Sequence, residues 1–344
     1  MTARIPVIDL DLALSGDAPE ELLASAREAA EQVGIIQVVN HGVPEELIDE
    51  FHDRVGAILA LPRERKAELA SPTGHPYRGW RQWPDDFGRL ELERYMIGQF
   101  ETPEEAVAAG LRPEYAALYA HPNVWPAGDP GLRELARRYH DASVGVAERV
   151  LALYARVLDV PVSTFPVSGR PYHTSFVVND YPTWTYGGNA DASEVADADK
   201  LLLLEHADGS ALTVLHQRGD YAGLQGQAPD GSWVPVPIVP GALQVFSGYI
   251  LTAWTNGRLR PGRHRVVAGG TVTRRSTGVF WHPSLDSVIE PLPPFAGEDS
   301  DFEPYLLWDQ ASRQVEEYLQ VFGRPDQIAA WREGRPYVAQ LAEA

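Results

Sequence analysis

Residues 175–283 consist of short apolar stretches separated by turns that contain glycine and proline. Short stretches with frequent turns are typical of β-strands in a jelly roll or barrel. Residues 131–158 differ, because their apolar residues recur at helical spacing, and residues 313–341 also favour a helix. We therefore predict an α+β fold with a mainly β core, flanked by N-terminal, middle and C-terminal helices.

The N-terminal part of the chain alternates between expected strands and helices. We predict strands at residues 5–10, 35–39 and 92–100, helices at 20–32 and 44–61, and a loop at 71–87. The loop is expected because this stretch is rich in glycine, proline and tryptophan. Residues 187–199 are polar and acidic, which predicts an insertion or a mobile loop. Whether this insertion covers a site as a lid stays open.

The composition narrows the chemistry and the partners of this chain. It contains no cysteine, which excludes disulfides and thiolate zinc sites, so any metal must be bound by histidines and carboxylates. Its formal net charge of −19 repels phosphate backbones and anionic membranes. No apolar run is long enough to span a membrane, and the N-terminus does not resemble a signal peptide. We expect a cytoplasmic protein that binds a small molecule and no nucleic acid; its oligomeric state stays open.

His206 and Asp208 lie two residues apart in the β-rich part of the chain. On an extended segment such residues point to the same side, so an imidazole and a carboxylate can meet at one point. His264 on a neighbouring strand would add a third ligand. Two histidines and one carboxylate leave three positions of an octahedron free, as an Fe(II) oxygenase requires. Zinc uses the same ligands, and a surface turn with an unrelated histidine is the alternative without a metal.

Arg274 and Ser276 show the same spacing on a later strand, where they share a face with Phe280. If this face points into the barrel, the buried guanidinium needs an anionic partner. A carboxylate held by the arginine, with a hydroxyl beside it, would satisfy that need. A dicarboxylic co-substrate would bind the metal at one end and Arg274 at the other. The alternative is an arginine that faces solvent.

Several ordered motifs resemble the isopenicillin N synthase-like family of 2-oxoglutarate/Fe(II)-dependent dioxygenases. IPVIDL and GIIQVVNHGVP resemble its N-terminal region, LEHADGSALTVLHQ resembles its core, and RRSTGVF places the Arg-x-Ser pair ten residues after His264. The resemblance implies a double-stranded β-helix (a cupin-like jelly roll). It also implies that His206, Asp208 and His264 bind iron and that Arg274 and Ser276 bind the distal carboxylate of 2-oxoglutarate. The NDYP segment resembles an Asn-x-Tyr-Pro motif of the family, which adds Tyr181 and Asn179 as co-substrate contacts.

The same resemblance implies a domain plan and a reaction. Residues 1–344 would form a single domain, with an N-terminal region at 1–125, the Fe(II)/2-oxoglutarate core at 172–290 and a C-terminal helical lid at 300–344. The implied co-substrates are 2-oxoglutarate and O2. The reaction would oxidise a C–H bond of a small molecule, by hydroxylation, in secondary metabolism such as antibiotic biosynthesis. The substrate, and the choice between hydroxylation, desaturation, cyclisation and ring expansion, stay open.

Three alternatives remain at this point. Some members of the family do not use 2-oxoglutarate and direct the arginine to the carboxylate of their substrate. A metal-free jelly roll that binds a small molecule is the second alternative, and a zinc hydrolase is the third.

Substrate contacts are expected from the loop at 71–87, the insertion at 187–199 and the C-terminal helix, because variable function resides in segments around a rigid core. The expected contacts are two arginines for a substrate anion, Arg78 and Arg81, and three aromatic residues for apolar walls, Trp80, Trp83 and Phe87. Three further histidines are interpreted as structural: His41, His216 and His282.

Overall fold

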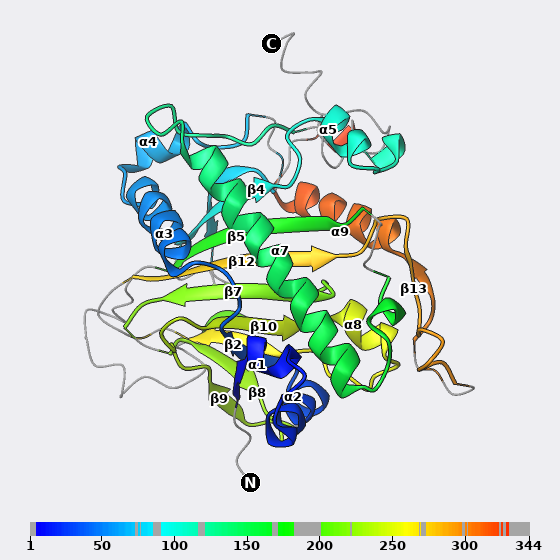
Figure 1. The fold of residues 1–344 in the computed structure, drawn as a ribbon. Helices are drawn as coiled ribbons and strands as arrows, with labels where there is room; N and C mark the ends of the chain where they lie inside the picture. Colours follow the sequence, from blue (N-terminus) through cyan, green and yellow to red (C-terminus); the bar gives the residue numbers. More distant parts are fainter. Residues whose placement is uncertain are drawn as a thin grey trace.

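The computed structural model describes residues 5–72, 75, 77–84, 91–115, 121–166, 171–181, 201–220, 222–267, 269, 273–297, 300, 302–322, 325, 328 and 329. Helices and strands alternate in the first half, and strands dominate after residue 172 (Figure 1). The helices are α1 (Leu10–Leu14), α2 (Glu20–Gln32), α3 (Glu45–Leu59), α4 (Arg63–Ala67), α5 (Pro103–Ala108), α7 (Leu132–Val157), α8 (Tyr249–Trp254) and α9 (Leu307–Phe322). Among these described helices, none combines the length and apolar character that crossing a membrane requires.

The strands fall into three sheets. Their bounds are β1 (Val7–Asp9), β2 (Ile35–Val39), β3 (Gly79–Pro84), β4 (Glu91–Gly98), β5 (His173–Tyr181), β6 (Leu201–His206), β7 (Leu212–Arg218), β8 (Leu224–Gln227), β9 (Trp233–Pro235), β10 (Leu243–Ser247), β11 (His264–Val267), β12 (Arg274–His282), β13 (Val288–Ile289) and β14 (Tyr305–Leu306). Eight strands form a sheet in the order β1-β2-β10-β7-β12-β5-β4-β3, and four form a second in the order β6-β11-β8-β9. The short pair β13–β14 forms the third.

The two larger sheets face each other. An apolar cluster joins Ile35 and Phe246 of the eight-stranded sheet to Leu224 and Val266 of the four-stranded sheet. Apart from the parallel pair β1–β2, neighbouring strands in both sheets are antiparallel. Two facing antiparallel sheets make a jelly roll, which confirms the predicted α+β fold with a mainly β core.

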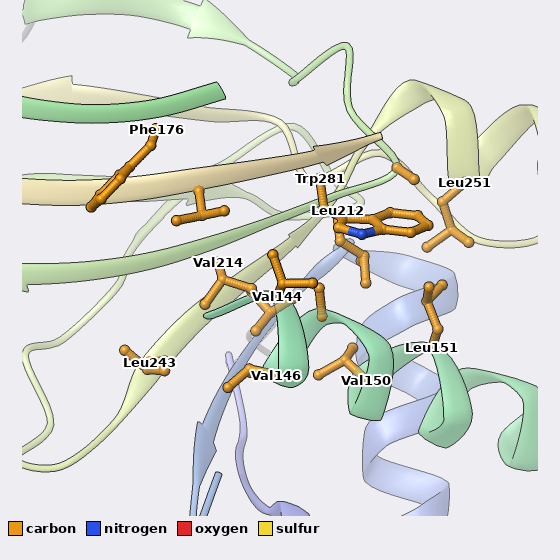
Figure 2. Packing of buried hydrophobic residues seen from close by; sticks show 14 of the residues in the cluster. Val144, Val146, Val150, Leu151, Phe176, Leu212, Val214, Leu243, Leu251 and Trp281 are labelled. Carbon is orange, nitrogen blue, oxygen red and sulfur yellow. The ribbon is translucent and has the colours of Figure 1, made fainter. Parts of the chain in front are cut away.

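The other face of the eight-stranded sheet is covered by helices. Helix α7 crosses this face, with α3 beside it (Figure 1). Val144 and Val150 of α7 point toward Leu212 and Trp281 on strands β7 and β12 (Figure 2). Each fully buried side chain of this kind stabilises the fold by about 2 kcal/mol relative to an exposed one. The helices therefore hold one face of β12 and leave its opposite face for the interior of the jelly roll.

Several boundaries follow the sequence closely. The predicted helix at 20–32 and strand at 35–39 are α2 and β2 as the structure has them. Gly34 separates them with a φ of 73°, a conformation that glycine adopts without strain. Its N–H donates to the carbonyl of Ala29, and a Cβ at this position would lie 2.3 Å from the carbonyl oxygen of Arg260. Only glycine therefore fits at position 34.

Two predicted boundaries were wrong. Part of the expected loop at 71–87 is the strand β3, which pairs with β4 at the edge of the sheet. Glycine and proline lie at the two ends of β3, and an edge position tolerates proline because, in the described sheet, β4 is the only strand that pairs with β3. Helix α9 begins at Leu307 rather than at Arg313. The acidic stretch at 187–199 lies outside the described residues, so its expected role as an insertion or lid stays a prediction.

Candidate active site

His206, Asp208 and His264 meet at one end of the four-stranded sheet. His206 is the last residue of β6, and it pairs directly with His264, the first residue of β11. Asp208 follows two residues after His206, as the spacing predicts. One ligand atom from each of the three side chains lies within 4.8 Å of the other two. These three residues, which lie far apart in the sequence, therefore form a compact group with the donor set of a metal centre.

Hydrogen bonds orient both imidazoles toward that centre. His206 Nδ1 lies 2.8 Å from the carbonyl oxygen of Leu204, and His264 Nδ1 lies 2.9 Å from that of Gly262. A carbonyl only accepts, so each Nδ1 carries the proton and donates it. The Nε2 atoms then keep their lone pairs for a metal, which is how metal-bound histidines are usually held.

The carboxylate is oriented by a neighbouring strand. Thr213 of β7 donates its hydroxyl to Asp208 Oδ2 over 2.6 Å. Asp208 Oδ1 remains on the side of His206, 3.8 Å from its Nε2. Asp208 and His264 are buried, and burial is the main cause that lowers the pKa of His264, while the nearby Asp208 carboxylate opposes it. Two imidazoles and one carboxylate suit Fe(II), and they suit Zn(II) as well.

Arg274 lies elsewhere on the wall of the same cavity, which has a volume of about 800 Å³. Its side chain is 1% exposed, and its guanidinium lies 4.9 Å from the centre of the Tyr181 ring. Nη2 donates to Gln217 Oε1 over 3.1 Å. Among the described residues, none accepts a hydrogen bond from Nε or Nη1, and none forms an ion pair with this arginine. A buried guanidinium with two unused donors is costly unless an anion binds it. The carboxylate of a bound dicarboxylic acid fits this position.

The strand register places the other expected co-substrate residues beside Arg274. On the neighbouring strands β12 and β5, Arg274 lies opposite Tyr181, and Ser276 lies opposite Asn179. All four side chains line the cavity, and Asn179 Oδ1 is buried without a hydrogen-bond partner among the described residues. Arg94 of β4, opposite Asn179 on its other side, also lines it. Arg94 was not among the co-substrate residues predicted from the sequence.

Of the expected substrate contacts, Arg78 lines the cavity and Trp80 does not, among the described residues. Arg78 lines the cavity, but its guanidinium donates to the carbonyl oxygens of Tyr77, Phe100 and His121. Trp80 is buried in the main apolar core and donates its ring N–H to Glu93, and it does not line the cavity among the described residues. Packing therefore accounts for the position of Trp80, and its role as a substrate contact stays a prediction.

The other expected contacts gain no support from the described cavity. Arg81 is also not among its described lining residues. The side chain of Trp83 and the whole of Phe87 lie outside the described part of the chain.

The histidines interpreted as structural divide into two groups. His41 Nδ1 accepts from the N–H of Val43, and His216 lies 2.8 Å from His52 in a buried pair outside the cavity. His282, in contrast, lines the cavity together with Phe280. The signal for this position was present in the sequence, because residues 274, 276, 280 and 282 share one face of a strand.

Profiles of known families match two parts of the chain. Residues 5–128 match the N-terminal region of the non-haem dioxygenases described for morphine synthesis, and residues 173–283 match the 2OG-Fe(II) oxygenase superfamily. Among relatives, kihadalactone A synthase LFS of Citrus sinensis is 30% identical over 318 residues, covering 87% of this chain and 88% of that protein. Validamycin A dioxygenase of Streptomyces hygroscopicus subsp. limoneus is 31% identical over 283 residues, covering 78% and 73%.

Solved structures share the fold. A Neurospora crassa protein in complex with α-KG and 5-formyluracil superimposes with a TM-score of 0.72 at 22% identity, covering 90% of this chain and 95% of that one. JOX2 in complex with 2OG, Fe and JA gives a TM-score of 0.71 at 22% identity, covering 95% and 89%. At this level of identity the likeness extends to the fold alone.

Proposed function

Because the chain belongs to the isopenicillin N synthase-like family of 2-oxoglutarate/Fe(II)-dependent dioxygenases, we propose that His206, Asp208 and His264 hold its iron. The enzyme uses Fe(II), 2-oxoglutarate and O2, as its family does. We assign the distal carboxylate of 2-oxoglutarate to Arg274 and Ser276, with Tyr181 and Asn179 beside them. The family thus selects one enzyme class from the alternatives that the sequence left open, and the residue roles within it are our proposal.

One observation carries this assignment. Arg274 is buried with two donor nitrogens that no described residue satisfies, and it faces the cavity that also contains the histidine–carboxylate group. The metal donors alone would suit zinc as well as iron. A dicarboxylate that reaches from Arg274 to the metal gives the buried charge its partner. The burial calls for a carboxylate, and the family's use of 2-oxoglutarate is the reason to assign that carboxylate to the co-substrate rather than to the substrate.

The reaction that we propose is hydroxylation: a substrate C–H group, O2 and 2-oxoglutarate give the alcohol, succinate and CO2. Bound Fe(II) and 2-oxoglutarate supply the oxidising chemistry. The chain positions the reactants. Thr213 fixes the Asp208 carboxylate, Arg274 fixes one end of the co-substrate, and the walls of the cavity limit access of water.

The substrate is proposed to be a small molecule of secondary metabolism. Support comes from the relatives, whose names include flavonol synthase/flavanone 3-hydroxylase and validamycin A dioxygenase, and from neighbours solved with thymine or JA. The validamycin enzyme also motivates antibiotic biosynthesis as one setting. The net charge of −19 supports a protein without a nucleic-acid partner, and a cytoplasmic location remains part of the proposal.

Anaerobic visible spectroscopy tests the residue roles. Adding Fe(II) and then 2-oxoglutarate to the purified protein should produce a weak charge-transfer band that needs both components. Arg274→Lys keeps the charge but loses the planar fork, so 2-oxoglutarate should bind about tenfold or more weakly. The matched control is Arg275→Lys on the same strand, because Arg275 pairs with Asp180 and does not line the cavity. Its band should be unchanged.

Two other results would redirect the assignment. Iron binding without a band would indicate that Arg274 binds the carboxylate of another molecule. Normal Fe(II) affinity in Asp208→Ala would remove Asp208 from the metal site.

A further inference from the structure

His282 lies beyond the metal donors when the cavity is followed from Arg274. On β7, Thr213 pairs with Phe280 of β12 and also donates to Asp208, so Asp208 lies level with Phe280. His282 is two residues further along β12, about 7 Å, on the side away from Arg274. The Asp208 carboxylate is near enough to raise the pKa of His282. His282 therefore faces the part of the cavity that the co-substrate leaves free.

The imidazole of His282 is neutral and has an unused atom. Burial lowers its pKa to about 4, although the backbone carbonyls of His173 and Phe280 oppose this shift. By the geometry of the described residues, Nδ1 is buried without a hydrogen-bond partner. The ring of His173, opposite on β5, lies 5.1 Å away, and burial is the main cause that also lowers its pKa. Each nitrogen of a neutral imidazole either donates or accepts, depending on the tautomer, so Nδ1 of His282 offers one polar atom to a ligand.

Gln310 of α9 provides a second polar group on the wall of the same cavity. Its Nε2 lies 3.4 Å from the point where a Cβ on Gly209 would lie, and Gly209 directly follows Asp208. Its Oε1 is buried, and no described residue donates a hydrogen bond to it. Gln310 and His282 both line the cavity. Buried polar atoms without partners are uncommon in folded proteins and need an explanation, and beside a cavity a bound ligand is one such explanation.

The charges around these two groups favour an uncharged ligand. Arg78 lines this end, but its guanidinium is directed at three backbone carbonyls. Arg313 and Glu317 of α9 line the cavity with exposed side chains of opposite charge. A substrate carboxylate or ammonium buried between His282 and Gln310 would lose its hydration without an opposite charge directed at it.

We propose that His282 and Gln310 recognise an uncharged group of the substrate that both donates and accepts hydrogen bonds, such as a ring amide. This inference rests on the proposed function, since it places the substrate between these residues and the metal. Neither residue reacts with the substrate in this proposal. They determine which molecules bind and hold the C–H group to be oxidised beside the iron.

Ligand-observed NMR on the Zn(II)- and 2-oxoglutarate-loaded protein tests the proposal without turnover, because zinc suits the same donors and is redox-inert. The probes share one ring size: 2-piperidone is a neutral amide, cyclohexanecarboxylate an anion, cyclohexylamine a cation and methylcyclohexane apolar. We expect 2-piperidone to bind at least about tenfold more tightly than the other three. His282→Phe and Gln310→Leu should each raise its Kd about three- to tenfold, the contribution of one neutral hydrogen bond.

Matched variants separate recognition from general damage. Gln320→Leu changes an exposed glutamine of the same helix that does not line the cavity, so its Kd for 2-piperidone should stay at the wild-type value. His282→Asn keeps a donor and an acceptor and should restore most of the affinity lost in His282→Phe. The affinity for 2-oxoglutarate should be equal in all four variants.

The possible failures are distinguishable. Tighter binding of the anion or the cation, no binding of 2-piperidone, or an unchanged Kd in both His282→Phe and Gln310→Leu would overturn the substrate class. The proposed function would survive those results as long as 2-oxoglutarate binds. If 2-oxoglutarate itself fails to bind the metal-loaded wild type, the proposed function and this inference both fail.

Discussion

Replacing Thr213 with valine removes one hydroxyl from beside Asp208 and keeps nearly the same side-chain shape. Thr213 is 1% exposed, and its 2.6 Å bond to Asp208 Oδ2 has the length of a hydrogen bond to an ionised carboxylate. In the described part of the chain, it is the only side chain that donates a hydrogen bond to Asp208. Without it, the carboxylate rotates more freely and is less well placed for a metal.

The size of the effect follows from two independent magnitudes. A hydrogen bond to a charged group contributes about 1.5–3 kcal/mol. Groups that orient metal ligands change metal affinity by about 10–100-fold when they are replaced. Since tenfold corresponds to about 1.4 kcal/mol, the two ranges overlap. We therefore expect the Kd for Fe(II) to rise about 10–100-fold in Thr213→Val.

Anaerobic equilibrium dialysis with Fe(II) measures this Kd, and Thr277→Val is the matched control. Thr277 is also 1% exposed and hydrogen-bonded, through the Tyr139 hydroxyl at 2.7 Å, but it faces α7 rather than the cavity. Both variants lose one buried hydroxyl, so urea unfolding should show similar losses of stability. Only Thr213→Val should weaken Fe(II) binding. An unchanged Kd in Thr213→Val, or an equal rise in Thr277→Val, would refute the role given to this hydroxyl.

Two further predictions concern stability. Lys66→Met removes the cation from a largely buried ion pair, in which Lys66 Nζ lies 2.5 Å from Glu93 Oε1. The free energy of unfolding measured in urea should fall by about 3 kcal/mol, because the Glu93 carboxylate stays buried without its partner. A fall below about 1 kcal/mol would show that Glu93 finds another partner. Burial lowers the pKa of His216 from 6.5 to about 4, so the unfolded chain binds more protons between these values and stability falls as the pH drops through this window. Between pH 7 and pH 5, His216 should account for about 2 kcal/mol of the decrease in the free energy of unfolding. In His216→Asn this free energy should therefore decrease less over the same pH range. Equal pH profiles of the two proteins would show that His216 is not the cause.

The sequence predicted the site better than it predicted the surrounding geometry. Two-residue spacing was sufficient to group His206 with Asp208 and Arg274 with Ser276, because side-chain direction on a strand depends on local spacing alone. The pairing of His206 with His264 depends on register between strands far apart in the chain. No local pattern determines such a register. The meeting of the three metal donors therefore needed either the structure or the family resemblance.

The misplaced strand and the overlooked cavity positions have equally local causes. Composition suggested a loop where β3 lies, since glycine and proline at the strand ends mask a short edge strand. His282 was interpreted as structural because no carboxylate accompanies it in the sequence. Its position on the face of Arg274 and Ser276 was the more informative signal. Gln310 could not have been found in this way, because its proximity to Gly209 depends on how α9 packs over the strands.

Strand β12 runs from the proposed co-substrate end of the cavity to the proposed substrate end. Its inward face carries Arg274 at the co-substrate end and His282 at the substrate end, while Trp281 on its outward face packs in the core beneath α7. Because side chains alternate along a strand, a slip of one residue would turn the inward set out of the cavity. The nine-residue pairing with β5 and the buried Trp281 oppose such a slip. Specificity can thus change at position 282 while Arg274 keeps its place, since the register that positions both is fixed from the opposite face.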